Sequence, residues 1–275
     1  MQLNRIEEAL EALKLGKSII VVDDEDRENE GDLVAVTEWM QDNTVNFMAK
    51  HGRGLICAPV SSDIAEKLKL HPMVSDNSDV YGTQFTVSID HVDTTTGISA
   101  AERMLTARAL IATSTTSATF NRPGHLFPLI AKDDGVLVRT GHTEASVDLA
   151  RLTGAKPAAL ICEIMNDDGS MAKGDSLEAF REQHQLVMIS IADLVEYRKH
   201  TESHIEARAK VQMPTEYGDF DMIGFTTASS RDEIVAIIKG EPRKTENVRI
   251  HSSCMTGDIF HSQRCDCGEQ LAESM

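Results

Sequence analysis

The sequence is short of positive charge and has no long hydrophobic run. It holds 27 Lys and Arg against 44 Asp and Glu in 275 residues, a formal net charge of −17. So acidic a chain is a poor general ligand for nucleic acid or for an anionic membrane. No stretch approaches the roughly 18 apolar residues of a transmembrane helix, and the N-terminus lacks the layout of a secretory signal. We therefore expect a cytoplasmic protein without nucleic-acid or membrane partners.

Cysteine is also scarce, with five residues in the chain. In a reducing compartment these are better read as thiols or metal ligands than as disulfides. Cys57 and Cys162 lie in apolar patterns, which is typical of a small buried hydrophobe. Dinucleotide-binding and P-loop fingerprints are missing from the sequence, so no organic cofactor is indicated.

Short apolar runs alternate with amphipathic ones, which predicts an α/β protein with a mixed sheet and helices. Hydrophobic residues make up 41% of the chain, enough for a sizeable core. We predict strands at 18–22, 33–36, 54–60, 83–89, 135–138, 158–165 and 185–191, and helices at 4–15, 99–111, 143–153 and 175–184. In the first helix, Asn4 is the expected N-cap and Gly16 the expected end.

The composition becomes polar near residue 200, in the stretch "EYRKHTESHIEARAK". We place a domain boundary at 200–206, between a domain of residues 1–200 and a second domain of residues 206–275. The second begins like a strand and ends on "CDCGEQLAESM". A domain of this length could fold alone, but only marginally.

The stretch "DDEDRENEGD" (23–32) places seven carboxylates in ten positions between two predicted strands. One interpretation is a Mg²⁺ site, because Mg²⁺ prefers hard oxygen ligands. The other is a solvated acidic turn, which charge alone would favour. A calcium loop of the EF-hand type fails, because its twelfth position would be Thr37 instead of Glu.

This loop and four later segments, taken in order, resemble the 3,4-dihydroxy-2-butanone-4-phosphate synthase family of riboflavin biosynthesis. The later segments are "TTTGISAAERMLT" (94–106), "RPGHLFPL" (122–129), "RTGHTEASVDLARLTG" (139–154) and "AALICEIMNDDGSMA" (158–172). An ordered set is more specific than any single motif. The resemblance implies a homodimer that uses Mg²⁺ or Mn²⁺ to convert ribulose 5-phosphate, a small sugar phosphate, into 3,4-dihydroxy-2-butanone 4-phosphate and formate.

The same resemblance implies roles for individual residues. Glu28 and His142 match the metal ligands, and His125 and Glu163 match the residues essential for proton transfer. The positions that match substrate contacts are Arg27, Glu28, Glu30, Asp32, Arg139, Thr140, Gly141, His142, Thr143 and Glu163. Taken alone, His125 would more often be structural and Glu163 could be a strand end facing water. The ordered set favours catalysis.

A second cluster, Cys254, Cys265 and Cys267, has the spacing C-x10-C-x-C. Three thiolates suggest Zn²⁺, and three ligands with one open position is the pattern of a catalytic site. A structural site closed by His251 or His261 is the rival, and a fortuitous cluster is the third alternative.

Residues 248–271 resemble the zinc-binding core of GTP cyclohydrolase II. The resemblance implies that the three cysteines ligate Zn²⁺. It also implies GTP contacts from Arg249, Ile250, His251, Ser252, Ser253 and Gln270. The family's catalytic aspartate and arginine nucleophile lie beyond the position of Met275. We therefore expect an incomplete α/β cyclohydrolase domain, a fragment or a remnant, that does not hydrolyse GTP here. A longer parent chain could bind and open GTP.

Overall fold

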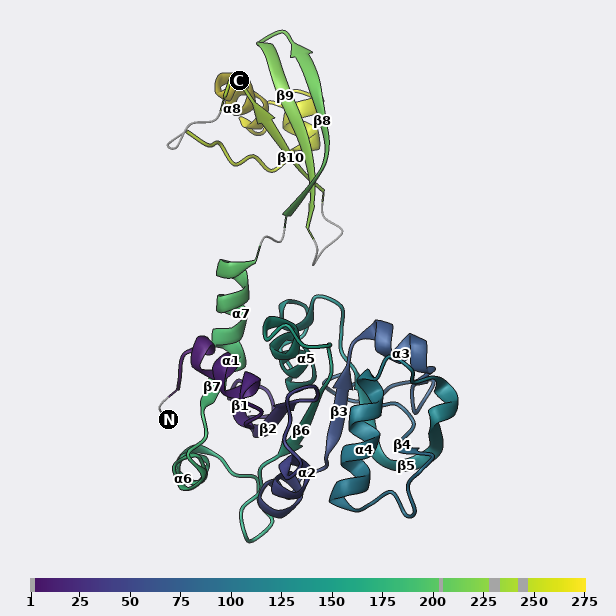
Figure 1. Ribbon diagram of the computed structural model, residues 1–275. Helices are drawn as coiled ribbons and strands as arrows, with labels where there is room; N and C mark the ends of the chain where they lie inside the picture. The colour runs from purple at the N-terminus through teal and green to yellow at the C-terminus, as the bar shows by residue number, and fades with distance from the viewer. Residues whose placement is uncertain (1–2, 203–204, 228–232, 242–246) are drawn as a thin grey trace. The chain divides into compact units, whose positions relative to one another are not determined.

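A computed structural model describes residues 3–202, 205–227, 233–241 and 247–275 (Figure 1). The chain divides into two compact units, Met1–Glu202 and Ser203–Met275. No helix among the described residues is long and apolar enough to cross a membrane.

The first unit is built on a seven-stranded mixed sheet of order β4-β5-β3-β6-β2-β1-β7. Its strands are β1 (Ile19–Val22), β2 (Gly31–Val36), β3 (Cys57–Val60), β4 (Ile89–His91), β5 (Phe120–Ile130), β6 (Ala159–Glu163) and β7 (Met188–Ser190). β1 pairs antiparallel with β2 and parallel with β7, and β3 pairs parallel with β5. β1, β2 and β3 are buried along their whole length, which explains their continuous apolar runs.

Helices cover both faces of this sheet (Figure 1). Ile20 and Leu33 point into one core, and Ile19 and Val34 point into the other, as alternation along strands requires. The first core also takes side chains from α2 (Thr44–Phe47), α3 (Ser62–Leu68), α4 (Ala100–Ile111) and α6 (Gly174–His184). The second takes them from α1 (Ile6–Lys14), α5 (His142–Leu152) and α7 (Ile191–Thr201). Short helical turns lie between these elements, namely η1 (Met48–Gly52), η2 (Ser117–Thr119) and η3 (Gly135–Leu137).

Two predicted strands are wrong. Residues 135–137 form the helical turn η3 and Val138 caps it, because Asp134 and Gly135 both have φ of 58° and turn the chain. The segment 83–89 makes only isolated bridges, at Phe85 and Thr86, before β4 begins. The strand β5 escaped prediction, since proline and glycine within "RPGHLFPL" argue against an inner strand.

The first helix starts later than predicted, at Ile6, and Asn4 is not its N-cap. The Asn4 side chain instead accepts the N–H of Met188 at 3.1 Å, which ties the N-terminal segment to β7. Gly16 follows the helix with φ of 75°, a left-handed conformation that favours glycine and ends the helix as predicted.

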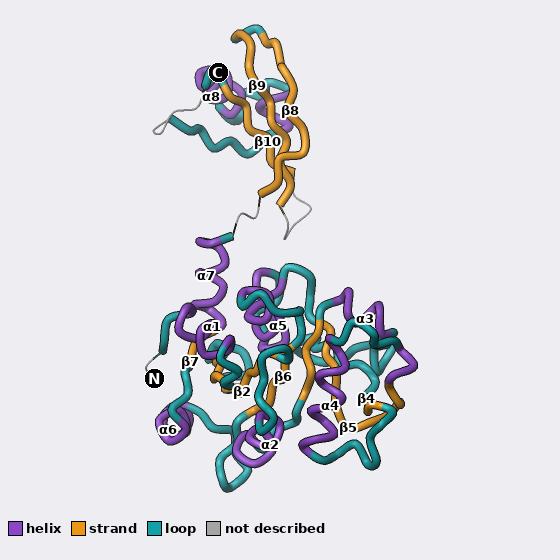
Figure 2. The backbone as a smooth tube through the Cα atoms, in the orientation of Figure 1, coloured by secondary structure: helices purple, strands orange, loops and turns teal. Residues whose placement is uncertain are grey.

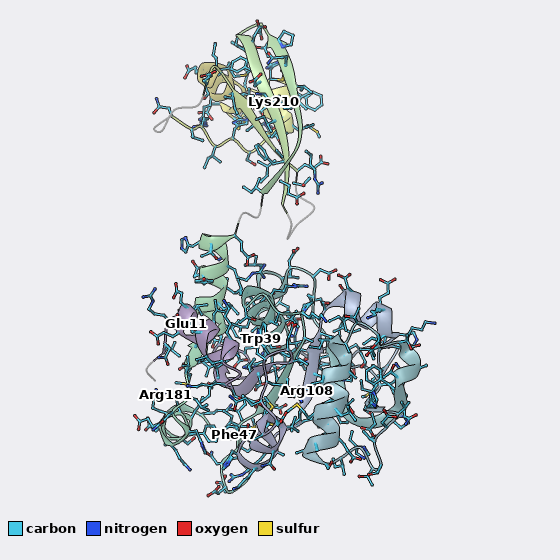
Figure 3. All side chains as sticks on the ribbon, in the orientation of Figure 1. Glu11, Trp39, Phe47, Arg108, Arg181 and Lys210 are labelled. Atoms are coloured by element: carbon cyan, nitrogen blue, oxygen red, sulfur yellow. The ribbon has the colours of Figure 1, made fainter. Side chains whose placement is uncertain are left out.

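The second unit has a three-stranded antiparallel sheet of order β10-β9-β8 (Figure 2). Its elements are β8 (Ile205–Thr215), β9 (Gly218–Thr227), β10 (Glu233–Ile238), η4 (Met255–Ile259) and α8 (Cys267–Ser274). Most described side chains of β8 are exposed, as the sticks around the labelled Lys210 illustrate (Figure 3). Phe220 of β9 is buried.

Candidate active site

One carboxylate, Asp23, organises the acidic loop between β1 and β2. Its Oδ1 accepts the N–H of Glu30 at 2.9 Å, and its Oδ2 accepts the N–H of Glu28 at 3.1 Å. Oδ2 also accepts Nη1 of Arg27 at 2.8 Å, and the Asp23 side chain is fully buried. Both oxygens are therefore engaged, which makes Asp23 a scaffold for the loop and leaves Glu28 available as a ligand.

The imidazole of His142, at the start of α5, is buried beside this loop. Its Nε2 lies 3.1 Å from the carbonyl oxygen of Val21. Because a carbonyl only accepts, Nε2 carries a proton, and Nδ1 is the nitrogen that faces the acidic loop. That Nδ1 lies 3.7 Å from Oε2 of Glu28 and 4.0 Å from Oδ1 of Asp32. Burial lowers the pKa of His142, but the charges of Asp32 and Glu28 outweigh burial and raise it to about 9.

Asp32 is buried in β2, and its Oδ1 has no hydrogen-bond partner. Burial raises the pKa of this carboxyl to about 7. A buried oxygen without a partner costs stability unless a ligand satisfies it. Ligand atoms of Asp23, Glu28 and His142 all lie within 4.8 Å of one another, a donor set that suits Mg²⁺ with water or substrate hydroxyls, and the orphan oxygen of Asp32 lies beside it, 4.0 Å from Nδ1 of His142.

Glu163 stands at the end of β6, directly opposite Asp32 in the antiparallel pair. Its Oε2 accepts the N–H of Leu55 at 2.8 Å. A Cβ at Gly54 would lie 2.4 Å from that same oxygen, so only glycine leaves room for the carboxylate. Burial, together with the charges of Glu28 and Glu163, raises the pKa of Glu30. Four predicted carboxylates are thus close enough to interact, which favours proton transfer among them.

His125 lies on β5 and forms a separate group with Asp90. Its N–H donates to Oδ1 of Asp90 at 2.9 Å, and its Nδ1 lies 2.8 Å from Oδ2. A Cβ at Gly97 would lie 2.0 Å from Asp90, so the "TTTG" segment packs on this pair. Within residues 3–202, no hydrogen bond or ion pair joins His125 to the acidic loop. Sequence reasoning missed Asp90. The one feature that could have indicated it is its position directly after an apolar run.

The predicted phosphate segment begins with Arg139 and leads into α5. The guanidinium donates through Nε to the carbonyl of Tyr81 at 3.0 Å and through Nη2 to Oγ1 of Thr83 at 2.9 Å. Nη1 pairs with the buried carboxylate of Glu144. A Cβ at Gly141 would lie 2.2 Å from Nη1 of Arg139, so a larger residue would displace the guanidinium.

The start of α5 adds anion-binding groups to this arginine. Thr140 and Gly141 precede the helix, and Thr143 is buried in its first turn. The first N–H groups of a helix have no intrahelical acceptor and attract anions. The segment Arg139–Thr143 therefore combines a guanidinium, a hydroxyl and free amides, which is the chemistry that a phosphate ester needs.

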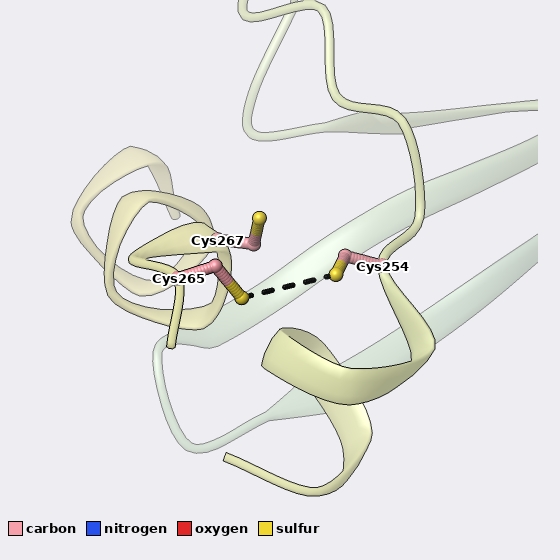
Figure 4. Close-up of side chains that lie close together, drawn as sticks. All are labelled: Cys254, Cys265 and Cys267. Carbon is pink, nitrogen blue, oxygen red and sulfur yellow. Dashed lines mark hydrogen bonds between the residues drawn. The ribbon is translucent and has the colours of Figure 1, made fainter. Parts of the chain in front are cut away.

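The three cysteines of the second unit gather around one point (Figure 4). Their sulfur atoms all lie within 4.8 Å of one another, and Sγ of Cys254 is 4.0 Å from Sγ of Cys265. Tetrahedral Zn²⁺ with its usual bonds would need sulfur atoms about 3.8 Å apart. The cluster in this part of the described chain contains no histidine. It fits Zn²⁺ with one open position.

His251 is linked to the cysteine cluster through Asp258. Its Nε2 lies 2.8 Å from Oδ2 of Asp258, which also accepts the N–H of Cys254 at 2.7 Å. Arg249 donates to the side chain of Gln270, so two of the predicted GTP contacts meet. The others, Ile250, Ser252 and Ser253, lie exposed on a segment without regular structure.

Comparison with known proteins divides the chain in two. The family model of 3,4-dihydroxy-2-butanone 4-phosphate synthase matches residues 7–197, and that of GTP cyclohydrolase II matches residues 206–275. The riboflavin biosynthesis protein RibBA of Staphylococcus saprophyticus is 74% identical over the whole chain, which covers 70% of that relative. The protein of the same name from Staphylococcus aureus is 69% identical over the same span.

Solved structures agree with this division. RibBX, a two-domain 3,4-dihydroxy-2-butanone 4-phosphate synthase from A. baumannii, is 39% identical, with a TM-score of 0.80 over 98% of this chain and 80% of its own. A synthase solved in complex with two magnesium ions is 40% identical, with a TM-score of 0.70 over 72% of this chain and 98% of its own.

Proposed function

This chain belongs to the 3,4-dihydroxy-2-butanone-4-phosphate synthase family, with a GTP cyclohydrolase II segment after it, and we propose that residues 1–200 carry the synthase reaction. The substrate is D-ribulose 5-phosphate, and the products of this lyase are L-3,4-dihydroxy-2-butanone 4-phosphate and formate. The observation that carries the proposal is the group of Glu28, His142 and Asp32, in which Nδ1 of the buried His142 lies 3.7 Å from Oε2 of Glu28 and 4.0 Å from the unpartnered Oδ1 of Asp32.

Glu28 and His142 would hold Mg²⁺ or Mn²⁺, which when bound polarises vicinal oxygens of the sugar. Asp32 and Glu163, opposite each other across two strands, take and return protons. The pKa of Asp32, raised by burial to about 7, suits a general base at neutral pH. Arg27 and Glu30 hold sugar hydroxyls, and Arg139–Thr143 bind the phosphate.

His125 supplies a further proton-transfer group. Asp90 engages its Nδ1, which leaves Nε2 as the reacting nitrogen. We propose a homodimer with sites near the subunit interface, a geometry that accommodates the separation of His125 from the acidic loop. If His125 acts across that interface, mixing two inactive variants, His125→Ala and Glu28→Ala, would form heterodimers that regain activity. No recovery after verified subunit exchange would place both residues in the same subunit's site.

The direct test is formate release by the purified chain from ribulose 5-phosphate and Mg²⁺, with and without EDTA. Formate that EDTA abolishes, together with a ketone product identified by ¹³C NMR, supports the proposal. We expect Glu28→Ala, His125→Ala and Glu163→Ala each to lose almost all activity while circular dichroism is unchanged. Retained activity in all three variants would refute the site assignment.

A cytoplasmic location of the protein stays a prediction.

A second function rests on the cysteine cluster and Zn²⁺. In a longer parent chain, Cys254, Cys265 and Cys267 would hold Zn²⁺, which would supply Lewis-acid activation of water for opening the guanine ring of GTP. A ring-opened pyrimidine formed from GTP and Zn²⁺ is the product that tests this second function.

A further inference from the structure

A surface turn outside the matched motifs contacts both arginines of the proposed synthase site. The hydroxyl of Tyr81 donates to the carbonyl of Arg27 at 2.9 Å, and Cζ of Arg27 lies 4.8 Å from the centre of the Tyr81 ring. One tyrosine thus holds the backbone and the guanidinium of Arg27 together. Arg27 in turn lies 3.0 Å from Oε2 of Glu28, the proposed metal ligand.

The same turn holds the arginine of the phosphate segment. The Tyr81 carbonyl accepts Nε of Arg139, and Oγ1 of Thr83 accepts Nη2, at 3.0 and 2.9 Å. With Glu144 on Nη1, three of the five guanidinium N–H groups are engaged. The other two remain for a phosphate, and their direction is set by the protein contacts.

The turn has its own internal bonds, so it does not depend on the arginines for its shape. Oδ2 of Asp79 accepts the N–H of Thr83 at 2.8 Å, and Nδ2 of Asn77 donates to the Thr83 carbonyl at 2.9 Å. The N–H of Gly82 reaches the Asp79 carbonyl at 3.1 Å, and Gly82 has φ of 67°. We call residues 77–83 the strap.

We propose that the strap is a template that sets the separation between Arg27 and Arg139, with Tyr81 as the positioning residue. The two guanidinium groups repel each other. Arg27 lies beside the proposed metal ligand Glu28, and Arg139 belongs to the proposed phosphate-binding segment. A rigid turn that touches both fixes the length of sugar phosphate that can be held. Tyr81 acts through the arginines and does not touch the reacting atoms. This inference rests on the proposed synthase function.

Three substitutions separate the two ends of the strap. Tyr81→Phe removes the hydroxyl bond to Arg27, Thr83→Val removes the acceptor for Arg139 together with the side-chain contact to Asp79, and Tyr81→Leu removes the ring. Tyr217→Phe is the matched control, since both tyrosines are 41% exposed and Tyr217 lies in the second unit. Unchanged urea midpoints, followed by the fluorescence of the single tryptophan, Trp39, would show that the first unit is folded.

We expect Thr83→Val and Tyr81→Phe each to raise KM for ribulose 5-phosphate about fivefold, the weight of one hydrogen bond. Tyr81→Leu should raise KM further, while kcat changes less than about threefold, because binding of the substrate and binding of the transition state are weakened alike. Wild-type KM in all three folded variants would overturn the proposal.

Hydrogen exchange supplies a readout that does not need turnover. In Tyr81→Phe and Tyr81→Leu, the amides of Glu28 and Glu30 should exchange faster, by about fivefold or more, because the acidic loop is less restrained. Thr83→Val and Tyr217→Phe should leave them unchanged. Unchanged exchange in Tyr81→Leu would refute the proposed role of the strap. Faster exchange in a chain that releases no formate would refute only the synthase proposal.

Discussion

Metal and proton compete for one nitrogen, Nδ1 of His142. The pKa of the metal-free imidazole is raised to about 9 against the pull of burial, so it is protonated at pH 7. Only the neutral ring can bind a cation, so each bound ion must expel a proton below pH 9. We expect at least one proton released per Mg²⁺ at pH 7, one from His142 and a further fraction from the neighbouring Asp32, and almost none at pH 10, with affinity rising between them.

Calorimetry in two buffers of different ionisation enthalpy measures this proton release. His200→Gln is the control, since the His200 side chain is 81% exposed on α7 and should not alter the count. Proton release that is equal at pH 7 and pH 10 would contradict the assignment of His142 as a ligand.

Asp23 offers a second test at the residue scale, because its carboxylate holds the loop and also lies within 4.8 Å of the ligand atoms of Glu28 and His142. Asp23→Ala removes three hydrogen bonds to one buried carboxylate. We expect a loss of about 2–4 kcal/mol in the free energy of unfolding of the first unit and Mg²⁺ binding weakened about tenfold. The neighbouring Asp24→Ala, at an exposed carboxylate, should change the free energy of unfolding by less than about 1 kcal/mol.

Among the elements, α7 is joined to α5 by a buried ion pair. Nη1 of Arg198 donates to Oδ2 of Asp148 and to the carbonyl of Asp134, each at 2.8 Å. Arg198→Ala would leave the buried Asp148 with only the more distant Arg151, at 3.6 Å, so we expect about 3 kcal/mol of destabilisation. Arg181→Ala, which breaks a pair within α6 alone, should cost about 0.5 kcal/mol. Urea unfolding followed by Trp39 fluorescence compares them, and equal costs would show that the α5–α7 pair carries no special weight.

The elements that the sequence predicted best are those with a local pattern. β1 and β2 are buried along their length, so their apolar runs identify them. η3 was mistaken for a strand because its direction depends on the left-handed backbone of Asp134 and Gly135 and on Asp148 of α5, which accepts the N–H of Val136. Local pattern cannot show such a contact.

The residues of the site also divide into those that a local sequence pattern predicts and those that it does not. Glu28, Asp32, His142 and Glu163 stood in recognisable motifs, and the fold brings them together. Tyr81 had no mark in the sequence, since an isolated tyrosine in a polar loop resembles any surface residue. Its importance comes from two arginines 54 and 58 positions away along the chain.

For the whole molecule, the two ligand sets differ in chemical softness and lie in different units. Glu28 and His142 offer oxygen and nitrogen, whereas Cys254, Cys265 and Cys267 offer three sulfur atoms. A zinc-selective chelator should therefore strip about one Zn²⁺ per chain and leave Mg²⁺-dependent formate release within about twofold of its starting rate. Cys254→Ser should lower the zinc content in the same way without altering formate release. Zinc is measured by plasma emission spectroscopy and formate by a coupled dehydrogenase assay. Formate release that vanishes with zinc, and that added Mg²⁺ fails to restore, would mean that the second unit supports the chemistry of the first.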